Sequence, residues 1–224
     1  MEWDWAYARE ILPLLLSGLK VTVIATVLGA AVAAVLGLVF ALLRRSSNRI
    51  VARTAGFLVQ FIRGTPLLVQ LYFIFYVLPD IGIRLPALAA GVIGMGLHYA
   101  TYAAEVYRGG IEAVPRGQWE AARAVGMTEG QTMRRIILPQ AARVFAPTMV
   151  NYFVDILKST SLAFTLGVTE MMGAAQKEAA GSFRYLESFL VVVIIYWIMV
   201  EVLSRVQAWL ERRTERRATG GTRA

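Results

Sequence analysis

The sequence predicts an all-α membrane protein with about five transmembrane helices, in one domain that spans residues 1–224. Two observations carry this prediction. Hydrophobic residues make up 57% of the chain and charged residues only 17%, which is less charge than a soluble domain usually has. The apolar residues also form separate runs of about 20 residues, the length that a helix needs to cross a hydrocarbon layer.

Five apolar runs define the expected spans. They cover residues 21–43, a run with its core at 67–78, and then 86–104, 144–166 and 188–203. The segment Arg63-Gly64-Thr65-Pro66 interrupts the second span, because Pro66 lacks an N–H and its ring clashes with the preceding turn. Residues 54–62 before this break form either an interfacial helix or the lower part of the span. Gly29 and Gly37 in the first span indicate close helix packing.

Basic residues gather in three segments of the chain, residues 44–53, 108–143 and the tail 205–224. An excess of Lys and Arg marks cytoplasmic loops. We therefore expect a multi-pass protein of a bacterial inner membrane, with the N-terminus outside and the C-terminus in the cytoplasm. The mixed-charge stretch 170–187 is then an outer loop. The net charge of +8 points to a lipid bilayer and not to nucleic acid, since no soluble basic fold is available to read a groove.

The residues needed for disulfides, for a metal site built from cysteines and histidines and for a phosphate-binding loop are absent from this chain. It has no cysteine and a single histidine, His98, so we expect no disulfide and no metal site. A Gly-x-x-x-x-Gly-Lys-Ser/Thr phosphate-binding loop is absent from the sequence, so ATP cannot be bound by that mechanism. We therefore expect no catalytic residues and no cofactor in this chain. A transport component fits better than an enzyme.

The polar segment 115–139 separates the third and fourth spans. Its defining residues are Glu120, Ala121, Ala122, Gly126, Leu138 and Pro139. We expect two short helices, with Gly126 in the left-handed backbone of the bend. Thr128 and Gln131 form a capping box that starts the second helix, and Pro139 is expected to end it. Taken alone, this pattern also fits an amphipathic connector on the membrane surface.

The spacing in this segment closely resembles the EAA motif of ABC-importer permeases, in which Glu-Ala-Ala is followed by Gly and then by Ile-x-Leu-Pro at fixed distances. The resemblance implies the type I permease fold, with cytoplasmic coupling helices that sit in a groove of an ATPase. The residues that would dock the ATPase are Glu120, Ala121, Ala122, Gly126, Leu138 and Pro139. The implied partners are an ABC ATPase dimer that binds ATP and Mg, a second permease subunit, identical or paralogous, and an extracytoplasmic solute-binding protein.

Further motifs resemble the polar amino-acid subfamily, of the histidine and glutamine type. They are Gly18-Leu19-x-Val21-Thr22, residues 63–70, residues 104–111 and residues 157–162. This likeness implies import of amino acids or similar small polar solutes by alternating access. The subfamily also includes importers of compatible solutes such as ectoine, so the motifs leave the solute open.

Ionisable residues inside a span are costly and are functional candidates. Asn151, Asp155 and Lys158 in the fourth span share one helical face by their spacing. Asp155 and Lys158 either pair with each other or bind the two charged ends of a zwitterion. We predict a substrate pathway that these three residues line together with Ser159, Thr160 and Gln70. The alternative is a polar cluster that holds helices together.

Other polar residues near the spans are expected to be structural. Arg63 should neutralise a carboxylate or meet lipid headgroups, and a gating role for the Arg63–Pro66 break is the alternative. Glu105 and Arg108 should form an ion pair, and His98 should be a buried hydrogen-bonding residue. A competing function is a secondary transporter that uses Asp155, Glu105 and His98 as relay groups. An intramembrane enzyme with a Ser159–Lys158 dyad is disfavoured, because neighbours in sequence do not face each other on a helix.

Overall fold

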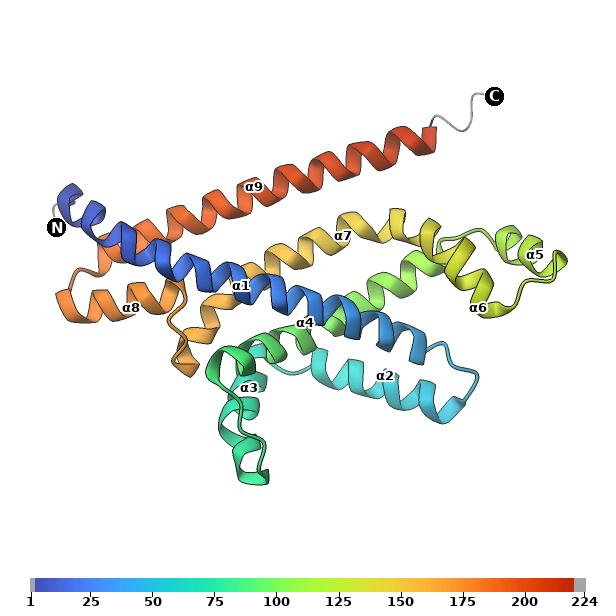
Figure 1. Ribbon diagram of the computed structural model, residues 1–224, viewed down its shortest axis with the longest axis horizontal. Helices are drawn as coiled ribbons and strands as arrows, with labels where there is room; N and C mark the ends of the chain where they lie inside the picture. The colour runs from blue at the N-terminus through green and yellow to red at the C-terminus, as the bar shows by residue number, and fades with distance from the viewer. Residues whose placement is uncertain (1–2, 220–224) are drawn as a thin grey trace.

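A computed structural model describes residues 3–219, and all regular elements among them are helical (Figure 1). The α-helices are α1 (Trp5–Leu43), α2 (Arg49–Arg63), α3 (Leu67–Tyr72), α4 (Ala87–Glu112), α5 (Arg116–Ala124), α6 (Glu129–Thr132), α7 (Leu138–Ser159), α8 (Met171–Ser182) and α9 (Tyr185–Thr219). Two π-helical segments, η1 (Phe73–Val77) and η3 (Met133–Ile137), and two 3-10 segments, η2 (Leu78–Ile81) and η4 (Thr160–Leu166), lie between them. The predicted all-α class is confirmed.

The long helices run roughly along one axis of the molecule, as Figure 1 shows for α1, α4, α7 and α9. Helix α8 lies at the end of this bundle near the N-terminus, and α5 and α6 lie at the opposite end. Close packing of α1 on α4 depends on Gly37. A Cβ atom there would approach the Cβ of Ala103 to 2.6 Å, so the expectation of close packing at Gly37 is confirmed.

Within residues 3–219, two helices are long and apolar enough to cross a membrane by themselves, α1 and the Tyr185–Trp209 part of α9. Helix α2 and the segment Leu67–Ile81 are also long and apolar enough to cross a membrane when taken together, although a sharp bend separates them. Helices α4 and α7, with 26 and 22 residues, are about 39 and 33 Å long at 1.5 Å per residue. They have the length of a span but are more polar than α1 and α9.

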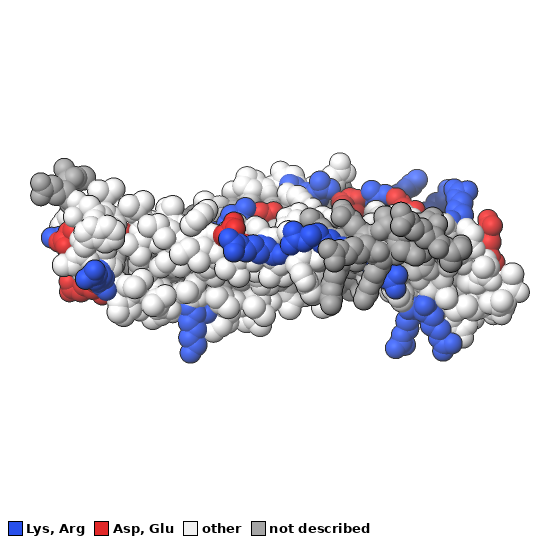
Figure 2. Space-filling view, turned by 90° about the horizontal axis from the view of Figure 1, so that it is seen from above, with Lys and Arg blue, Asp and Glu red and all other residues white. Residues whose placement is uncertain are grey.

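Charged side chains are unevenly spread over the surface. Figure 2 shows Lys and Arg gathered toward the end that carries α5 and α6, while much of the rest of this face is neither acidic nor basic. Large apolar side chains such as Val27, Val35 and Trp197 are exposed along the long helices. An apolar belt of this kind fits a lipid environment.

Helix α1 begins 16 positions before the expected start of the first span. Asp4 caps it, since its Oδ1 accepts hydrogen bonds from the backbone N–H groups of Ala6 and Tyr7, which satisfies two donors of the first turn. The extra turns bury Ile11 and Leu15 against α8 and α9. Tertiary packing of this apolar stripe therefore extends the helix beyond the expected 21–43.

The predicted break in the second span is confirmed. Helix α2 ends at Arg63, Pro66 precedes α3, and the two segments are bent by 105°. Pro66 explains why the helix stops, because it cannot supply the N–H of a continuing turn.

The expectation that Pro139 ends the second polar helix is wrong. Helix α6, η3 and α7 follow each other without a gap, and Pro139 lies in the first turn of α7. A proline is tolerated there because its missing N–H falls at a helix start, and the preceding π-helical turn changes the hydrogen-bond spacing. The helix that contains the expected fourth span accordingly starts at Leu138, six positions before residue 144.

The stretch 170–187, which was expected to be an outer loop, is not irregular. Most of this stretch forms α8, and Glu170 at its start is fully buried. After Ser159, the expected fourth span continues only as the 3-10 segment η4. The basic tail 205–224 is helical as far as Thr219, and residues 220–224 lie outside the described part of the chain.

Candidate functional site

The segment 115–139 forms the expected bent pair of short helices. Gly126, between α5 and α6, has a φ of +77°, a left-handed conformation that glycine adopts without strain. The capping box is present, with the Thr128 side chain accepting from the N–H of Gln131 and the Gln131 side chain accepting from the N–H of Thr128. The bend and the helix start therefore follow from local sequence.

The six predicted docking residues differ in exposure. Glu120, Ala121, Gly126 and Pro139 are exposed, Leu138 is half-buried and Ala122 is buried. Ala122 therefore packs inside its own chain, and Ala121 is the alanine that can face a partner. The docking role of the set stays a prediction.

A cavity of about 870 Å³ opens beside Glu120. Trp119 in its lining lies under the guanidinium of Arg45, which is 5.6 Å from the centre of the ring. The cavity therefore joins the α1–α2 loop to the polar segment. Its lining residues are Leu42, Arg45, Ser46, Ser47, Arg116, Trp119, Glu120, Arg123, Met127, Glu129, Gly130, Thr132 and Met133.

The predicted pathway residues of α7 are only partly together. Nζ of Lys158 lies 2.8 Å from Oδ1 of Asp155, and both side chains are about half exposed. Asn151 is also exposed, one turn before Asp155. These three residues form a polar face on the surface of α7. The pairing of Asp155 with Lys158 leaves open whether a solute binds there, so the pathway role stays a prediction.

The other three predicted pathway residues are each engaged in hydrogen bonds within the chain. Ser159 is 2.8 Å from the hydroxyl of Tyr99 on α4. Thr160 is fully buried, and its hydroxyl donates to the carbonyl of Leu157. Gln70 lies at the break between α2 and α3 and donates to the carbonyl of Ile62 at 2.7 Å.

A cluster of aromatic rings between α4 and α7 was missed in the sequence. The ring centres of Tyr99, Tyr102 and Tyr152 lie 5.8 to 6.4 Å apart. Tyr99 and Tyr102 are three residues apart on α4, but helical spacing gives no signal for the full cluster, because Tyr152 comes from α7. The cluster extends the polar surface from Ser159 toward Arg63, whose guanidinium is 5.0 Å from the ring of Tyr102.

Glu105 binds more arginines than the sequence suggested. The expected pair with Arg108 is present at 2.9 Å, and Arg44 from the end of α1 lies at 2.6 Å. Arg63 is 3.6 Å away, so the carboxylate that it was expected to neutralise is Glu105. One carboxylate thus joins α1, α2 and α4.

Glu170 is a second residue that sequence reasoning missed. Its carboxylate caps α8 by accepting from the N–H groups of Met172 and Gly173. It also accepts from the hydroxyls of Thr22 at 3.3 Å and Tyr196 at 3.2 Å. Burial of a carboxylate requires such partners. Two of its four donors belong to α8 itself, and the other two come from α1 and α9 through the tertiary fold.

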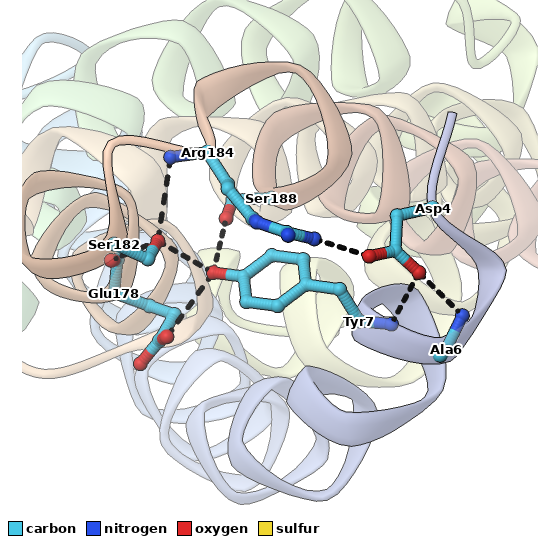
Figure 3. A network of polar contacts seen from close by, with 7 residues as sticks. All are labelled: Asp4, Ala6, Tyr7, Glu178, Ser182, Arg184 and Ser188. Atoms are coloured by element: carbon cyan, nitrogen blue, oxygen red, sulfur yellow. Dashed lines mark hydrogen bonds and ion pairs between the residues drawn. The ribbon is translucent and has the colours of Figure 1, made fainter. Parts of the chain in front are cut away.

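A polar network closes the end of the molecule near the N-terminus (Figure 3). Arg184 binds Asp4 at 2.5 Å and lies over the ring of Tyr7. The Tyr7 hydroxyl is 2.7 Å from Ser182 and donates to Glu178 at 3.1 Å. The guanidinium of Arg184 holds the pKa of Asp4 below its ordinary value. This network fastens the start of α1 to the corner between α8 and α9.

Comparisons with known proteins agree on one class. Residues 33–216 match the family described as "Binding-protein-dependent transport system inner membrane component". The chain is 46% identical over 216 residues to the probable amino-acid ABC transporter permease protein PatM of Vibrio harveyi, covering 95% of this chain and 97% of PatM.

A second relative and a solved structure extend the likeness. The L-cystine transport system permease protein TcyB of Bacillus subtilis is 40% identical, with 96% of this chain and 92% of TcyB covered. The fold matches a chain of an amino acid ABC transporter crystallised with histidines, with a TM-score of 0.87 and 35% identity over 95% of this chain and 100% of that one.

Proposed function

The chain belongs to the family of binding-protein-dependent transport system inner membrane components, and from that premise we propose that it is the membrane-spanning subunit of an ATP-driven importer of amino acids or similar small zwitterionic solutes. The observation that carries this proposal is the bent α5–α6 element, which presents Glu120 beside a concave, charged surface. A transport subunit without a phosphate-binding loop needs such a docking surface.

The proposed docking rests on shape and charge. Glu120 and Ala121 are exposed on α5, and the cavity of about 870 Å³ beside them could receive a protruding loop or helix end. A carboxylate at its rim suits a basic side chain or a helix N-terminus of the partner. An ATPase dimer, which binds ATP and Mg, would push on this element when it closes.

The solute class is inferred from relatives and from the polar face of α7. PatM and TcyB are named as amino-acid and L-cystine permeases. The carboxylate of Asp155 and the ammonium of Lys158 lie 2.8 Å apart on an exposed surface. An amino acid could take the place of this ion pair. Its ammonium would bind Asp155 and its carboxylate would bind Lys158, so that no charge is left unpaired. Ectoine and related compatible solutes have the same pair of charges.

The remaining partners and the orientation follow from the same proposal. Two permease subunits, identical or paralogous, would move between inward-open and outward-open states, and an extracytoplasmic binding protein would deliver the solute. The cluster of basic side chains near α5 and α6 (Figure 2) supports a cytoplasmic position for this end. The start of α1 and helix α8 would then lie outside.

Uptake into reconstituted vesicles tests the function. The complete complex with its ATPase and binding protein would be supplied with a panel of amino acids, betaines and ectoine. We expect accumulation of one solute class that requires ATP on the cytoplasmic side and survives an ionophore. Uptake that ignores ATP and collapses with the ionophore would instead support a secondary transporter and refute the proposal.

A further inference from the structure

The break between α2 and α3 faces one stripe of α4. His98, Tyr102 and Glu105 are spaced by four and three residues, which places them on the same side of a helix. Each of the three contacts the break: His98 meets Gln70, and both Tyr102 and Glu105 meet Arg63. The 105° bend is therefore held on both sides by a single helix.

Gln70 restrains the α3 side of the break. Its Nε2 donates to the carbonyl of Ile62 at 2.7 Å and to the carbonyl of Thr65 at 3.1 Å. Pro66 has no N–H to donate to the carbonyl of Ile62 in a continuing helix, and this carbonyl also accepts from the N–H and the hydroxyl of Thr65. The Oε1 of Gln70 lies 3.3 Å from Nδ1 of His98. The side chain thus bridges the two ends of the break and fastens them to α4.

Arg63, the last residue of α2, restrains the other side. Its Nη1 lies 3.6 Å from Oε1 of Glu105, farther from this carboxylate than the nitrogens of Arg44 at 2.6 Å and Arg108 at 2.9 Å. The Arg63 side chain is also the most exposed of the three, at 42%. Arg63 is therefore the weakest of the three links to this carboxylate.

The arrangement lets Arg63 leave at low cost. Removal of one partner of a buried ion pair usually leaves the other charge unpaired, and this is strongly unfavourable. Glu105 would keep Arg44 and Arg108, so it stays neutralised. Arg63 itself borders a cavity of about 480 Å³ with polar lining, and the face of Tyr102 can still attract its charge.

We propose that Glu105 is a positioning residue of the transport cycle, which fixes the angle between α2 and α3 by holding Arg63 and releases it when the angle changes. This inference rests on the proposed function, because it assigns the movement to an ATP-driven cycle. Gly64 and Thr65 are the residues at which the backbone turns. The His98–Gln70 contact keeps α3 on the same stripe of α4 while Arg63 moves.

Distance measurements across the break test the movement. The natural chain has no cysteine, so two exposed positions can be spin-labelled specifically after substitution. They are Phe57→Cys on α2 and Ile81→Cys at the end of η2, which continues from α3 through η1. In the complete complex in nanodiscs, we expect the distance between the labels to change between the nucleotide-free state and the vanadate-trapped state. An identical distance distribution in both states overturns the proposal.

Substitution of Arg63 tests its link to Glu105. Arg63→Gln leaves Glu105 paired with Arg44 and Arg108, so the fold is retained. In the absence of nucleotide, we expect the ratio of the two populations of label–label distances to change by about fivefold or more. The solute imported per ATP hydrolysed should fall by a similar factor, with an unchanged KM for solute. Arg63→Lys keeps the charge and should restore both values.

Arg53→Gln is the matched control, since Arg53 is an exposed arginine on the same helix. If Arg63→Gln behaves like Arg53→Gln, the inference is wrong. ATP-driven uptake by the unmodified complex separates the two proposals. ATP-driven uptake with an unchanged distance between the labels refutes only the proposed role of Glu105 and Arg63. Absence of ATP-driven uptake refutes both this role and the proposed function.

Discussion

The hydroxyl of Tyr196 on α9 donates a 3.2 Å hydrogen bond to the carboxylate of Glu170, which caps α8. Thr22 on α1 donates to the same carboxylate, so one fully buried acid connects three helices. The 3.4 Å contact between Tyr196 and Thr160 extends the connection to η4. The polar centre of this end of the molecule is therefore a carboxylate that the sequence placed in an outer loop.

Replacement of Glu170 should weaken the fold. Glu170→Ala leaves the hydroxyls of Thr22 and Tyr196 and two N–H groups of α8 without their acceptor, and each buried group left unsatisfied costs about 1–3 kcal/mol. We expect a lower melting temperature of the purified protein in detergent. Glu10→Ala, which removes an exposed glutamate of α1, should change it little. Equal melting temperatures for the two variants would show that the Glu170 contacts contribute no stability.

Gly37 should not tolerate a side chain. The Cβ of Gly37→Ala would lie 2.6 Å from the Cβ of Ala103 and 2.9 Å from the carbonyl oxygen of Ala100. Helix α1 would have to move away from α4, and overpacking of this kind costs about 1–3 kcal/mol. Gly56→Ala is the control, because nothing lies within 4 Å of the added atom. Thermal unfolding should separate the two variants, and a stable Gly37→Ala would argue against the tight α1–α4 contact.

Charge reversal at Glu120 should prevent ATPase binding. Glu120→Lys places a positive charge at the rim of the cavity beside α5, where we expect a basic group or a helix N-terminus of the partner. Co-purification of the ATPase should be lost, and membrane insertion should be unaffected because Glu120 is exposed. Glu10→Lys, at the opposite end of the molecule, should retain the ATPase. Normal co-purification with Glu120→Lys would count against the docking surface.

Neutralisation of Asp155 should change transport and not the fold. Asp155→Asn breaks only a half-exposed ion pair with Lys158, and exposed pairs contribute about 0–1 kcal/mol. We expect an altered KM for solute with the complex still assembled, measured by uptake and size-exclusion chromatography. Glu201→Gln breaks a similarly spaced exposed pair with Arg205 on α9 and should leave the KM unchanged. Loss of assembly in Asp155→Asn alone would identify the pair as structural.

The contact between Asp4 and Arg184 should depend on pH. The folded pKa of Asp4 is lowered, chiefly by the hydrogen bond from Arg184. A lowered pKa stabilises the folded state above the ordinary value near 4, and this contribution disappears as pH falls through the folded pKa. The difference in melting temperature between the natural chain and Asp4→Asn should therefore shrink from pH 6 to pH 3. With Asp80→Asn, an exposed aspartate, no such trend is expected, and a constant difference for Asp4→Asn would contradict the assignment.

The sequence predicted those features that depend on neighbours along the chain. The break at Pro66, the bend at Gly126 and the capping box of Thr128 are each set by residues within a few positions. Pro139 was misread because a proline near a helix end and one near a helix start look alike in sequence. The structure places it in the first turn of α7.

The tertiary structure alone decided which polar groups meet. Glu105 binds Arg44 from 61 positions away, and Glu170 binds Thr22 from 148 positions away. Helical periodicity fixes which residues share a face of one helix, but it carries no information on which other helix lies against that face. The sequence by itself therefore determined an all-helical membrane protein with a bent polar element at residues 115–139. The three-arginine environment of Glu105 and the burial of Glu170 arise only when α1, α2, α4, α8 and α9 pack together.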